Sequence, residues 1–315
     1  ANVAKGTFLS NMSHDMRTPL TAILGLIQLD LQKPDLPEDL AEDLGKVEAS
    51  SKYLLGLIEE ILETSQIHAG KIVSVSSAIR EKTIVDNIDK VMAVQMKQMG
   101  RNFQIQVTDS VNRVVMADAK HLERVLVNLL QNSLKYTKKG GHIRLGVNVR
   151  YAGSTARYTF TVRDDGVGMS KDFQKRMYLP FEQEGKNPNG GEVGNGLGLY
   201  IVKTLTSIMD GDISCISEEG HGTEFILHFT FPLATDEQVR LASYHAETYE
   251  EQVLYGKNVL LGEDNRINAE VIMKILKTKG IHYELATDGQ EALDLFRTQG
   301  AYHFQAILMD LMMPV

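Results

Sequence analysis

The first seventy residues carry apolar side chains at helical spacing. From residue 8 to residue 31, apolar positions recur every three or four residues, which predicts one amphipathic helix. These positions are Phe8, Met12, Met16, Leu20, Leu24, Ile27 and Leu31. Pro19 lacks the amide hydrogen that the helix ladder needs, so we expect a bend there. The Pro-Asp-Leu-Pro stretch at residues 34–37 predicts a turn, with Asp35 capping a second helix.

The second helix carries apolar and small residues at alternating spacings of four and three, which is a heptad seam. The seam consists of Leu40, Leu44, Val47, Ser51, Leu54, Ile58, Ile61 and Ser65. Two helices cannot enclose such a seam, whereas two copies of the hairpin would complete a four-helix bundle. We therefore expect a parallel homodimer through residues 1–70. The alternative is that the seam packs on the next domain of the same chain.

Residues 71–234 show strand and helix patterns in an irregular order. The expected strands are residues 72–75, 103–107, 114–116, 142–150 and 157–163. The expected helices are residues 79–99 and 118–136, the second capped by Asp118. Residues 211–231 predict a β-hairpin that turns at 218–222. Because helices alternate irregularly with mostly antiparallel strands, the pattern predicts an α+β sandwich.

The last part of the chain predicts a second, smaller α/β unit after a polar linker at 235–256. The expected strands are residues 259–262, 283–286 and 306–309, and the expected helices are residues 266–278 and 289–299. This strand–helix alternation predicts a parallel sheet. Glu263, Asp264 and Asp310 follow strands, so they should meet at one edge, where three carboxylates would repel without a cation such as Mg²⁺.

Composition narrows the function classes. The chain has 315 residues, of which 43% are hydrophobic and 23% charged, and its net charge is −8. This acidity gives a nucleic-acid-binding role no electrostatic support. No apolar run approaches the roughly 20 residues that cross a bilayer. The single cysteine, Cys215, excludes an internal disulfide and fits a reducing, cytoplasmic setting. The abrupt ends suggest a piece of a longer protein, whose preceding part could hold a sensor or a membrane anchor.

Residues 8–20, FLSNMSHDMRTPL, carry the first candidate chemistry. If this stretch is helical, His14 and Thr18 share one face, because side chains four residues apart stack. A neutral imidazole is a usable nucleophile near pH 7, and the neighbouring Asp15 could orient or deprotonate it. The plain alternative is a surface helix that happens to carry a histidine.

The helix at 118–136 carries a second candidate group. Asn128 and Asn132 are four residues apart and share a face, and Lys135 follows one turn later. Amide oxygens are hard ligands suited to Mg²⁺, and a lysine adds a positive charge for phosphate oxygens. The alternative is an ordinary polar helix face.

Glycine-rich segments follow. Asp164, Gly166 and Gly168 end a strand, where a carboxylate can accept from an exocyclic amine and glycines let backbone approach a flat ring. Residues 184–194 are rich in Gly, Asn and Pro and predict a lid or a plain surface loop. Gly194, Gly196 and Gly198 then lead into a helix at about Leu197, and a helix N-terminus entered by glycines suits phosphate.

These motifs occur in one order: a histidine segment, an asparagine helix, DxGxG, a phenylalanine segment at Phe181, and GxGLGL. In this order they resemble the sensor histidine kinases, whose ATP-binding domain has the Bergerat fold shared with gyrases and a heat-shock chaperone. The resemblance covers nearly all of residues 1–234. It implies ATP and Mg²⁺ as cofactors. Asp165 and Asn195 depart from the residues common in the family, an asparagine and a threonine.

The resemblance assigns roles to single residues. It implies that His14 accepts phosphate, that Asp15 is the base, that Thr18 helps position water for dephosphorylation, and that Asn132 holds Mg²⁺. The implied ATP-binding residues are Asn128, Asn132, Lys135, Tyr136, Asp164, Gly166, Gly168, Gly194, Gly196, Leu197, Gly198 and Thr223.

The C-terminal part resembles a response-regulator receiver domain of flavodoxin-like fold, with Asp310 as the phosphate-accepting aspartate and Glu263, Asp264 and Asp310 around Mg²⁺. The family's later Thr/Ser, Lys and two further strands are absent from this half-receiver. The chain thus reads as a hybrid histidine kinase: a phosphotransfer hairpin (1–70), an ATP-binding domain (71–234), a linker (235–256) and a partial receiver (257–315). Its downstream partner would be a receiver or a histidine-phosphotransfer protein. The alternatives are a Bergerat-fold ATPase without histidine phosphorylation and a nucleotide-binding scaffold.

Overall fold

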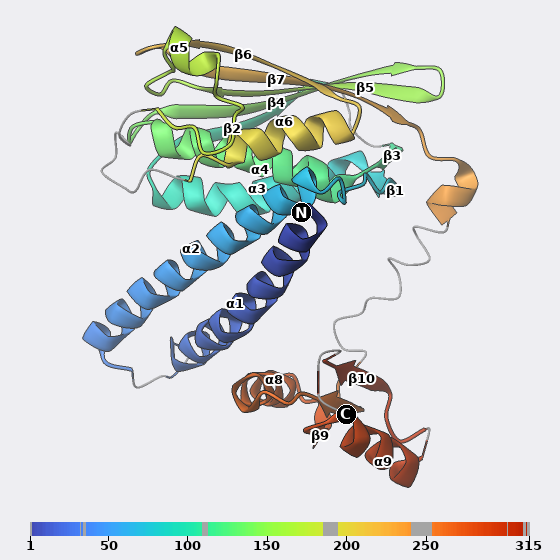
Figure 1. Ribbon diagram of the computed structural model, residues 1–315. Helices are drawn as coiled ribbons and strands as arrows, with labels where there is room; N and C mark the ends of the chain where they lie inside the picture. Colours follow the sequence, from blue (N-terminus) through green and yellow to red (C-terminus); the bar gives the residue numbers. More distant parts are fainter. Residues whose placement is uncertain are drawn as a thin grey trace. The chain divides into compact units, whose positions relative to one another are not determined.

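The computed structural model in Figure 1 describes residues 2–31, 33, 36–108, 113–184, 195–240, 254–300, 302–310 and 313. For residues 2–15, 18 and 68 it describes only the backbone. Contacts divide the chain into two compact units. One comprises residues 60–246, and the other comprises residues 3–59 together with 247–315.

Two long helices form the N-terminal hairpin, as the periodicity predicts. Helix α1 spans Asn2–Leu31 and continues through Pro19, and α2 spans Glu38–His68. Gln28 Nε2 donates a hydrogen bond to Glu48 Oε1 at 3.3 Å and so joins the two helices. The acidic residues Glu38 and Asp39 open α2, where they complement the partial positive charge of the helix N-terminus.

The unit of residues 60–246 is the α+β unit. Its described residues form seven strands and, besides the end of α2, the labelled helices α3 to α6. Its strands are β1 (Ser77–Arg80), β2 (Asn102–Val107), β3 (Val114–Ala117), β4 (His142–Ala152), β5 (Thr155–Asp164), β6 (Asp212–Glu218) and β7 (Gly222–Pro232). Its helices are α3 (Glu81–Gln98), α4 (Ala119–Tyr136), α5 (Lys171–Gln174) and α6 (Gly198–Ile208). The predicted mixture of helices with mostly antiparallel strands is confirmed.

Five strands form one sheet in the order β2-β4-β5-β7-β6, in which only the β2–β4 pair is parallel. A separate two-stranded sheet pairs β1 with β3 antiparallel. The strand expected at residues 72–75 is wrong. Val73 and Val75 are about two-thirds exposed, and the Val75 amide donates to the Asp118 carboxylate at 2.8 Å, so pairing begins only at Ser77.

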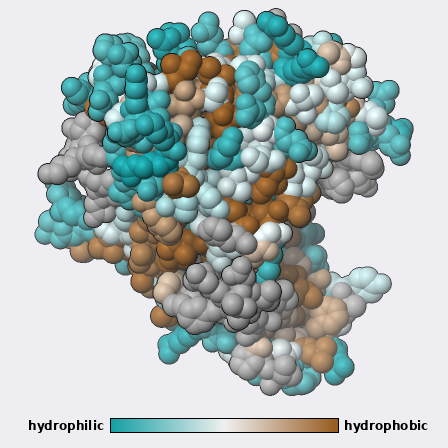
Figure 2. All heavy atoms as spheres, turned by 45° about the horizontal axis from the view of Figure 1, so that its top comes forward, coloured by the Kyte–Doolittle hydropathy of each residue, from teal (hydrophilic) through white to brown (hydrophobic). Residues whose placement is uncertain are grey.

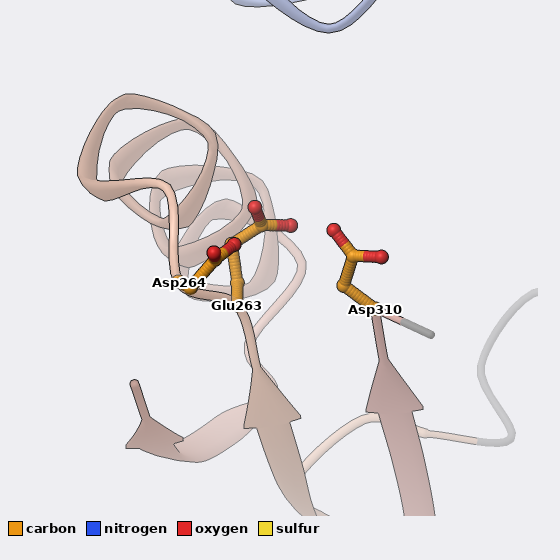
Figure 3. Close-up of side chains that lie close together, drawn as sticks. All are labelled: Glu263, Asp264 and Asp310. Carbon is orange, nitrogen blue, oxygen red and sulfur yellow. The ribbon is translucent and has the colours of Figure 1, made fainter. Parts of the chain in front are cut away.

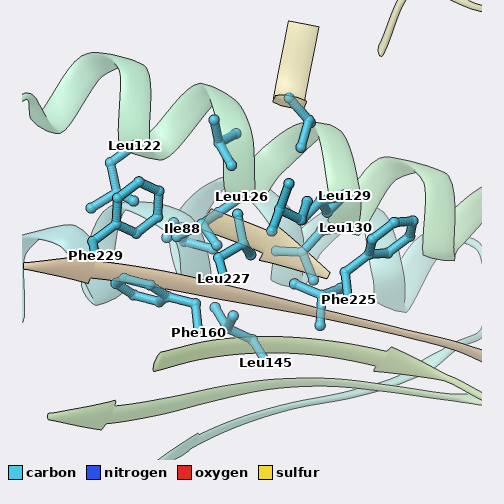
Figure 4. Close-up of a cluster of buried hydrophobic side chains, with 14 of the residues drawn as sticks. Ile88, Leu122, Leu126, Leu129, Leu130, Leu145, Phe160, Phe225, Leu227 and Phe229 are labelled. Atoms are coloured by element: carbon cyan, nitrogen blue, oxygen red, sulfur yellow. The ribbon is translucent and has the colours of Figure 1, made fainter. Parts of the chain in front are cut away.

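The core of this unit lies between the large sheet and the layer of α3, α4 and α6 (Figure 1). Figure 4 shows apolar side chains of α4 meeting those of the sheet strands. The labelled residues are Ile88, Leu122, Leu126, Leu129, Leu130, Leu145, Phe160, Phe225, Leu227 and Phe229. Alternate residues of β4 and β5 are buried here, so the intervening residues face away from the helices. Cys215 is half-buried at the margin of this core.

The C-terminal α/β part contains β8 (Asn258–Gly262), α8 (Arg266–Thr278), β9 (His282–Ala286), α9 (Gly289–Gln299) and β10 (Ala306–Met309). Its three strands are parallel in the order β10-β8-β9, as the alternation predicts. Asn265 caps α8 by accepting from the amides of Ile267 and Asn268. Asp288 caps α9 in the same manner.

Among the described residues, no helix is both long enough and apolar enough to pass through a bilayer.

Candidate functional site

The asparagine face of α4 opens into a hollow of about 440 Å³ at one end of the α+β unit. Asn128, Asn132, Lys135 and Tyr136 all line this hollow. Asp118 starts the helix by accepting from the His121 amide at 3.1 Å. The 3.6-residue period then keeps the polar positions on one side while leucines pack underneath. The structure therefore brings together the four α4 residues that the sequence singles out.

Asp164 lies at the end of β5 in the same hollow and is 8% exposed. Its carboxylate accepts from Ser133 Oγ at 2.8 Å and from the Gly166 amide at 3.0 Å. Burial raises the pKa of Asp164 above its ordinary value, and these hydrogen bonds partly offset that rise. The hydrogen bonds hold the carboxylate in a fixed orientation, which suits recognition of an amine donor.

Glycine is required where two loops approach each other beneath Asp164. Gly168 has φ +68°, and an added Cβ would lie 1.9 Å from the carbonyl oxygen of Glu218. Gly222 has φ +88°, and its Cβ would lie 2.1 Å from the Asp164 carbonyl oxygen. The backbone after β5 and the β6–β7 turn thus pack at a separation that any side chain would prevent.

The N-terminus of α6 also lines the hollow through Gly198. The side-chain Nδ2 atom of Asn132 lies 3.9 Å from the position that a Cβ on Gly198 would take, so α4 and α6 are close at this point. Gly196 precedes the helix with φ +74° and accepts a hydrogen bond from the Phe181 amide at 3.0 Å. Unpaired amides at a helix N-terminus are suited to anionic oxygen atoms.

An apolar wall completes the hollow, and the sequence motifs did not reveal it. Its residues include Met169, Phe173, Met177 and Phe225. Met169 follows β5, Phe173 lies in α5, Met177 follows α5, and Phe225 lies in β7. Phe173, Met177 and Phe225 are buried. A flat ring held by its polar edge at Asp164 would lie against such a wall. The sequence signal that could have revealed this wall is the cluster of Met169, Phe173 and Met177, which matches no recognised motif.

Several polar residues of the site were also missed, and three of them make informative contacts. Ser133 orients Asp164, Glu184 accepts from the Ser170 amide at 3.1 Å, and Glu60 reaches the hollow from α2. Glu60 accepts a hydrogen bond from the amide of Asn195. Burial lowers the pKa of Lys135, and the Glu60 carboxylate opposes that shift. Nothing in the sequence near Glu60 distinguishes it from the other acidic residues of α2.

The donor set of the α4 face fits a hard divalent cation such as Mg²⁺. Asn132 supplies an amide oxygen at the hollow, and the Asn128 side chain is 4% exposed. Among the described residues, the Asn128 Nδ2 atom is buried without a hydrogen-bond partner. An unpaired N–H donor suits an acceptor such as a phosphate oxygen of a ligand, so the cation would be held by amide oxygens and not by this atom.

A second cluster lies at the edge of the C-terminal sheet. Glu263 and Asp264 follow β8, and Asp310 follows β10 (Figure 3). Carboxylate oxygens of all three lie within 4.8 Å of one another. Glu263 is 7% exposed and accepts from Asn268 Nδ2 at 3.1 Å, which holds it in place. Three carboxylates this close are suited to an oxygen-preferring cation such as Mg²⁺. The predicted meeting of these residues is confirmed.

Other predicted site residues stand apart from this picture. His14, Asp15 and Thr18 belong to α1, but their side chains lie outside the described part, as does Gly194 with the expected lid segment at 185–194. Gly166 and Leu197 do not line the hollow. Gly166 is buried and donates to Asp164, and Leu197 is fully buried at the start of α6. Thr223 lines the hollow as expected.

Comparison with known families accounts for both the hairpin and the hollow. Residues 4–70 match the His Kinase A (phospho-acceptor) domain. Residues 117–235 match the histidine kinase-, DNA gyrase B- and HSP90-like ATPases. The chain belongs to the histidine kinase family. The second match gives the chain an ATP-binding domain, and the phospho-acceptor domain implies a homodimer.

Relatives of this kinase include the sensory/regulatory protein RpfC of Xanthomonas campestris, 30% identical over 100% of this chain and 46% of that protein. The aerobic respiration control sensor ArcB of Escherichia coli is 28% identical over 98% of this chain and 38% of its own length. The hybrid signal transduction histidine kinase K of Dictyostelium discoideum is 26% identical, and the match covers 99% of this chain and 26% of that protein. The chain thus spans less than half the length of these relatives.

Among solved structures, the crystal structure of full-length ShkA in complex with AMPPNP has a TM-score of 0.57 to this kinase. The two are 25% identical, and the match covers 91% of this chain and 57% of ShkA. The printed names of the relatives describe sensory or control proteins and, for the Dictyostelium protein, a hybrid signal transduction histidine kinase. The C-terminal parallel sheet is consistent with a partial receiver domain.

Proposed function

We propose that this chain is an autophosphorylating core in which ATP donates its γ-phosphoryl group to His14 and the group then passes to Asp310. The observation that carries this proposal is the convergence of Asn132, Lys135 and Asp164 on one hollow, beside the N-terminus of α6. We propose the domain division 1–70, 71–234, 235–256 and 257–315 for this relay.

The hollow offers each part of ATP a chemically suited group. The Asp164 carboxylate would accept the exocyclic amine of adenine, while Met169, Phe173 and Met177 contact the ring. Lys135 and the amides at the start of α6 would face the phosphates. Mg²⁺ held by the Asn132 oxygen, with Asn128 beside it, would neutralise charge on the phosphates.

In the chemical step the protein mainly positions the reactants and neutralises charge. A neutral imidazole nitrogen of His14 would attack the γ-phosphorus. A P–N bond forms, the bond to the bridging oxygen breaks, and ADP leaves. Asp15 would orient the ring and take its proton. Thr18 would help position the water that later breaks the P–N bond and releases phosphate. Pro19 and the 66–72 segment are the proposed bending points that let the hairpin present His14.

Onward transfer would use the acidic cluster of the C-terminal sheet. A carboxylate oxygen of Asp310 would attack the phosphorus, breaking the P–N bond and forming a P–O bond. Glu263 and Asp264 would hold Mg²⁺, which screens the incoming phosphoryl group. A separate receiver or a histidine-phosphotransfer protein would be the downstream partner.

The exposed side of α2 supports a homodimer through residues 1–70. Every seventh residue of its seam is a large apolar side chain that remains 45–48% exposed in one copy. These residues are Leu40, Val47, Leu54 and Ile61. Exposed apolar residues at heptad spacing are the surface that a second helix covers in a bundle.

Radiolabelled ATP offered to the wild type and to His14→Gln tests the proposed acceptor. The wild type should gain label that is stable in alkali and lost in acid, and His14→Gln should gain none. His142→Gln is the matched control, because His142 lies outside residues 1–70 and is paired with an aspartate, Asp165, at 3.0 Å. Undiminished label on His14→Gln would reject His14 as acceptor. Phosphate release without any protein label would instead favour a plain ATPase.

A further inference from the structure

The outer face of the five-stranded sheet, which points away from α3, α4 and α6, carries a group of arginines. Alternate residues of β4 and β5 point to this face because their neighbours are buried in the core. Arg144 and Arg150 come from β4, and Arg157 and Arg163 come from β5. All four are exposed. Figure 2 turns this face towards the viewer, and hydrophilic residues occupy much of it.

The strand register sets these arginines in two directly opposed pairs. Arg144 lies opposite Arg163, and Arg150 lies opposite Arg157. Like charges directly opposite each other on neighbouring strands are unfavourable. Among the described residues, none of the four forms an ion pair, although Glu224 of β7 lies opposite Arg163. The sheet thus keeps a repulsive arrangement that a bound anion would relieve.

A shallow hollow surrounds the second pair. Its polar lining includes Asn148, Arg150, Arg157, Thr159, His228 and Thr230. Thr159 Oγ1 and His228 Nδ1 are 3.1 Å apart, which fixes the edge of the hollow towards β7. Amide, hydroxyl and guanidinium groups can all donate to carboxylate oxygens, and guanidinium does so in bidentate fashion. No carboxylate lines this hollow among the residues that the structure describes.

The size and chemistry of the face favour an extended acidic peptide. The two arginine pairs are six residues apart along β4, so about 20 Å separates them, the length of roughly six extended residues. The residues between them, Gly146, Asn148, Thr159 and Thr161, are small or polar. Tyr158 and Phe229 also line the hollow but are 3% and 2% exposed, so the imidazole of His228 is the one exposed aromatic ring among the lining residues that the structure describes. The chain's net charge of −8 opposes every long polyanion, so the attraction is confined to this face and favours a short acidic segment over a nucleic acid.

We propose that the outer face of the five-stranded sheet, centred on Arg150 and Arg157, binds an acidic polypeptide segment of a partner protein. Carboxylates of the segment contact the two arginine pairs, and the neutral polar residues between them donate to its backbone or side chains. This surface is separate from the ATP-binding hollow, because none of its residues lines that hollow.

Fluorescence polarisation with a labelled poly-L-glutamate peptide and the full 315-residue chain tests this proposal. The wild type should bind, with an affinity that falls as salt rises. Arg150→Thr/Arg157→Thr should weaken binding on the order of tenfold, because two charge contacts are lost. Lys82→Gln/Lys90→Gln removes the same charge from the exposed side of α3 and should leave binding unchanged.

Folding of the variants is checked by melting temperature and by ATP-dependent autophosphorylation. Both should be retained, because threonine suits strands and the substitution removes a repulsion. The proposal is overturned if the wild type does not bind the peptide, or if the arginine and lysine variants lose affinity equally. It is also overturned if a single-stranded oligonucleotide or a phosphatidylserine vesicle binds this face more tightly than the peptide does.

Discussion

Replacing Asp164 by asparagine removes a charge from the proposed ATP-binding hollow while it keeps the shape of the side chain. The wild-type carboxylate is 8% exposed and is held by Ser133 Oγ at 2.8 Å and the Gly166 amide at 3.0 Å. The substituted side chain can keep one acceptor oxygen for the Gly166 amide, and the Ser133 hydroxyl can rotate to accept from the new amide. What it cannot keep is a charged acceptor for the adenine amine.

The loss can be estimated from the hydrogen bond that is removed. A hydrogen bond to a charged group contributes about 1.5–3 kcal/mol, so Asp164→Asn should weaken ATP binding about 10- to 150-fold. Discrimination against GTP should fall as well, because guanine presents a carbonyl where adenine presents the amine. The asparagine amide would donate to that carbonyl.

Isothermal titration with ATP and GTP, at fixed pH and Mg²⁺, measures both effects. Asp165→Asn is the matched control. The neighbouring Asp165 is exposed and does not line the hollow. Its carboxylate accepts from the His142 backbone amide at 2.8 Å and lies 3.0 Å from Nδ1 of the His142 ring. Its substitution should leave both affinities within about twofold.

Equal ATP affinity of Asp164→Asn and the wild type would refute the reasoning, because the carboxylate would then make no contact with the base. A loss of affinity in Asp165→Asn of the same size would also refute it. The effect would then come from the net charge of the loop and not from one oriented acceptor.

Four further outcomes are expected. In chemical denaturation, Gly168→Ala should lose more than about 3 kcal/mol of unfolding free energy, because the new Cβ would clash with Glu218. Gly153→Ala, also at positive φ but with open space around it, should lose only about 1 kcal/mol. Leu54→Glu should weaken dimerisation about 100-fold or more in sedimentation, because a charge replaces the leucine that each copy would bury in the proposed dimer. Val94→Glu on the exposed side of α3 should not. Glu60→Gln should tighten ATP binding about threefold by removing a negative charge from the hollow; weaker binding would contradict this. The raised pKa of Asp164 means that the stability contributed by its protonated form is complete below pH 3.8 and is lost as pH rises through the folded-state pKa. The melting temperature of the wild type relative to Asp164→Asn should therefore fall over that range, and a constant difference would exclude the shift.

The sequence by itself determined the local elements and the chemistry that they carry. The periodicity of residues 1–70 predicts both helices of the hairpin, and the spacing of Asn128 and Asn132 predicts a shared face on α4. Strand patterns and turn glycines place β4 to β7 correctly. These features depend on residues a few positions apart, so near-neighbour sterics and hydrophobic periodicity are enough to specify them. The strand predicted from the apolar residues at 72–75 is wrong, because the same pattern also occurs in an extended segment that pairs with no other strand.

Only the tertiary structure decided which distant groups meet. Ser133 bonds Asp164 across 31 residues of sequence, and Asn195 bonds Glu60 across 135. The apolar wall at Met169 and Met177, and the opposed arginines of β4 and β5, likewise follow from packing and strand register. Such contacts depend on how whole elements pack, and a single strand shifted by one residue would turn its arginines into the core. No local pattern encodes that choice, because the free energy that decides it comes from the assembled sheet and helices.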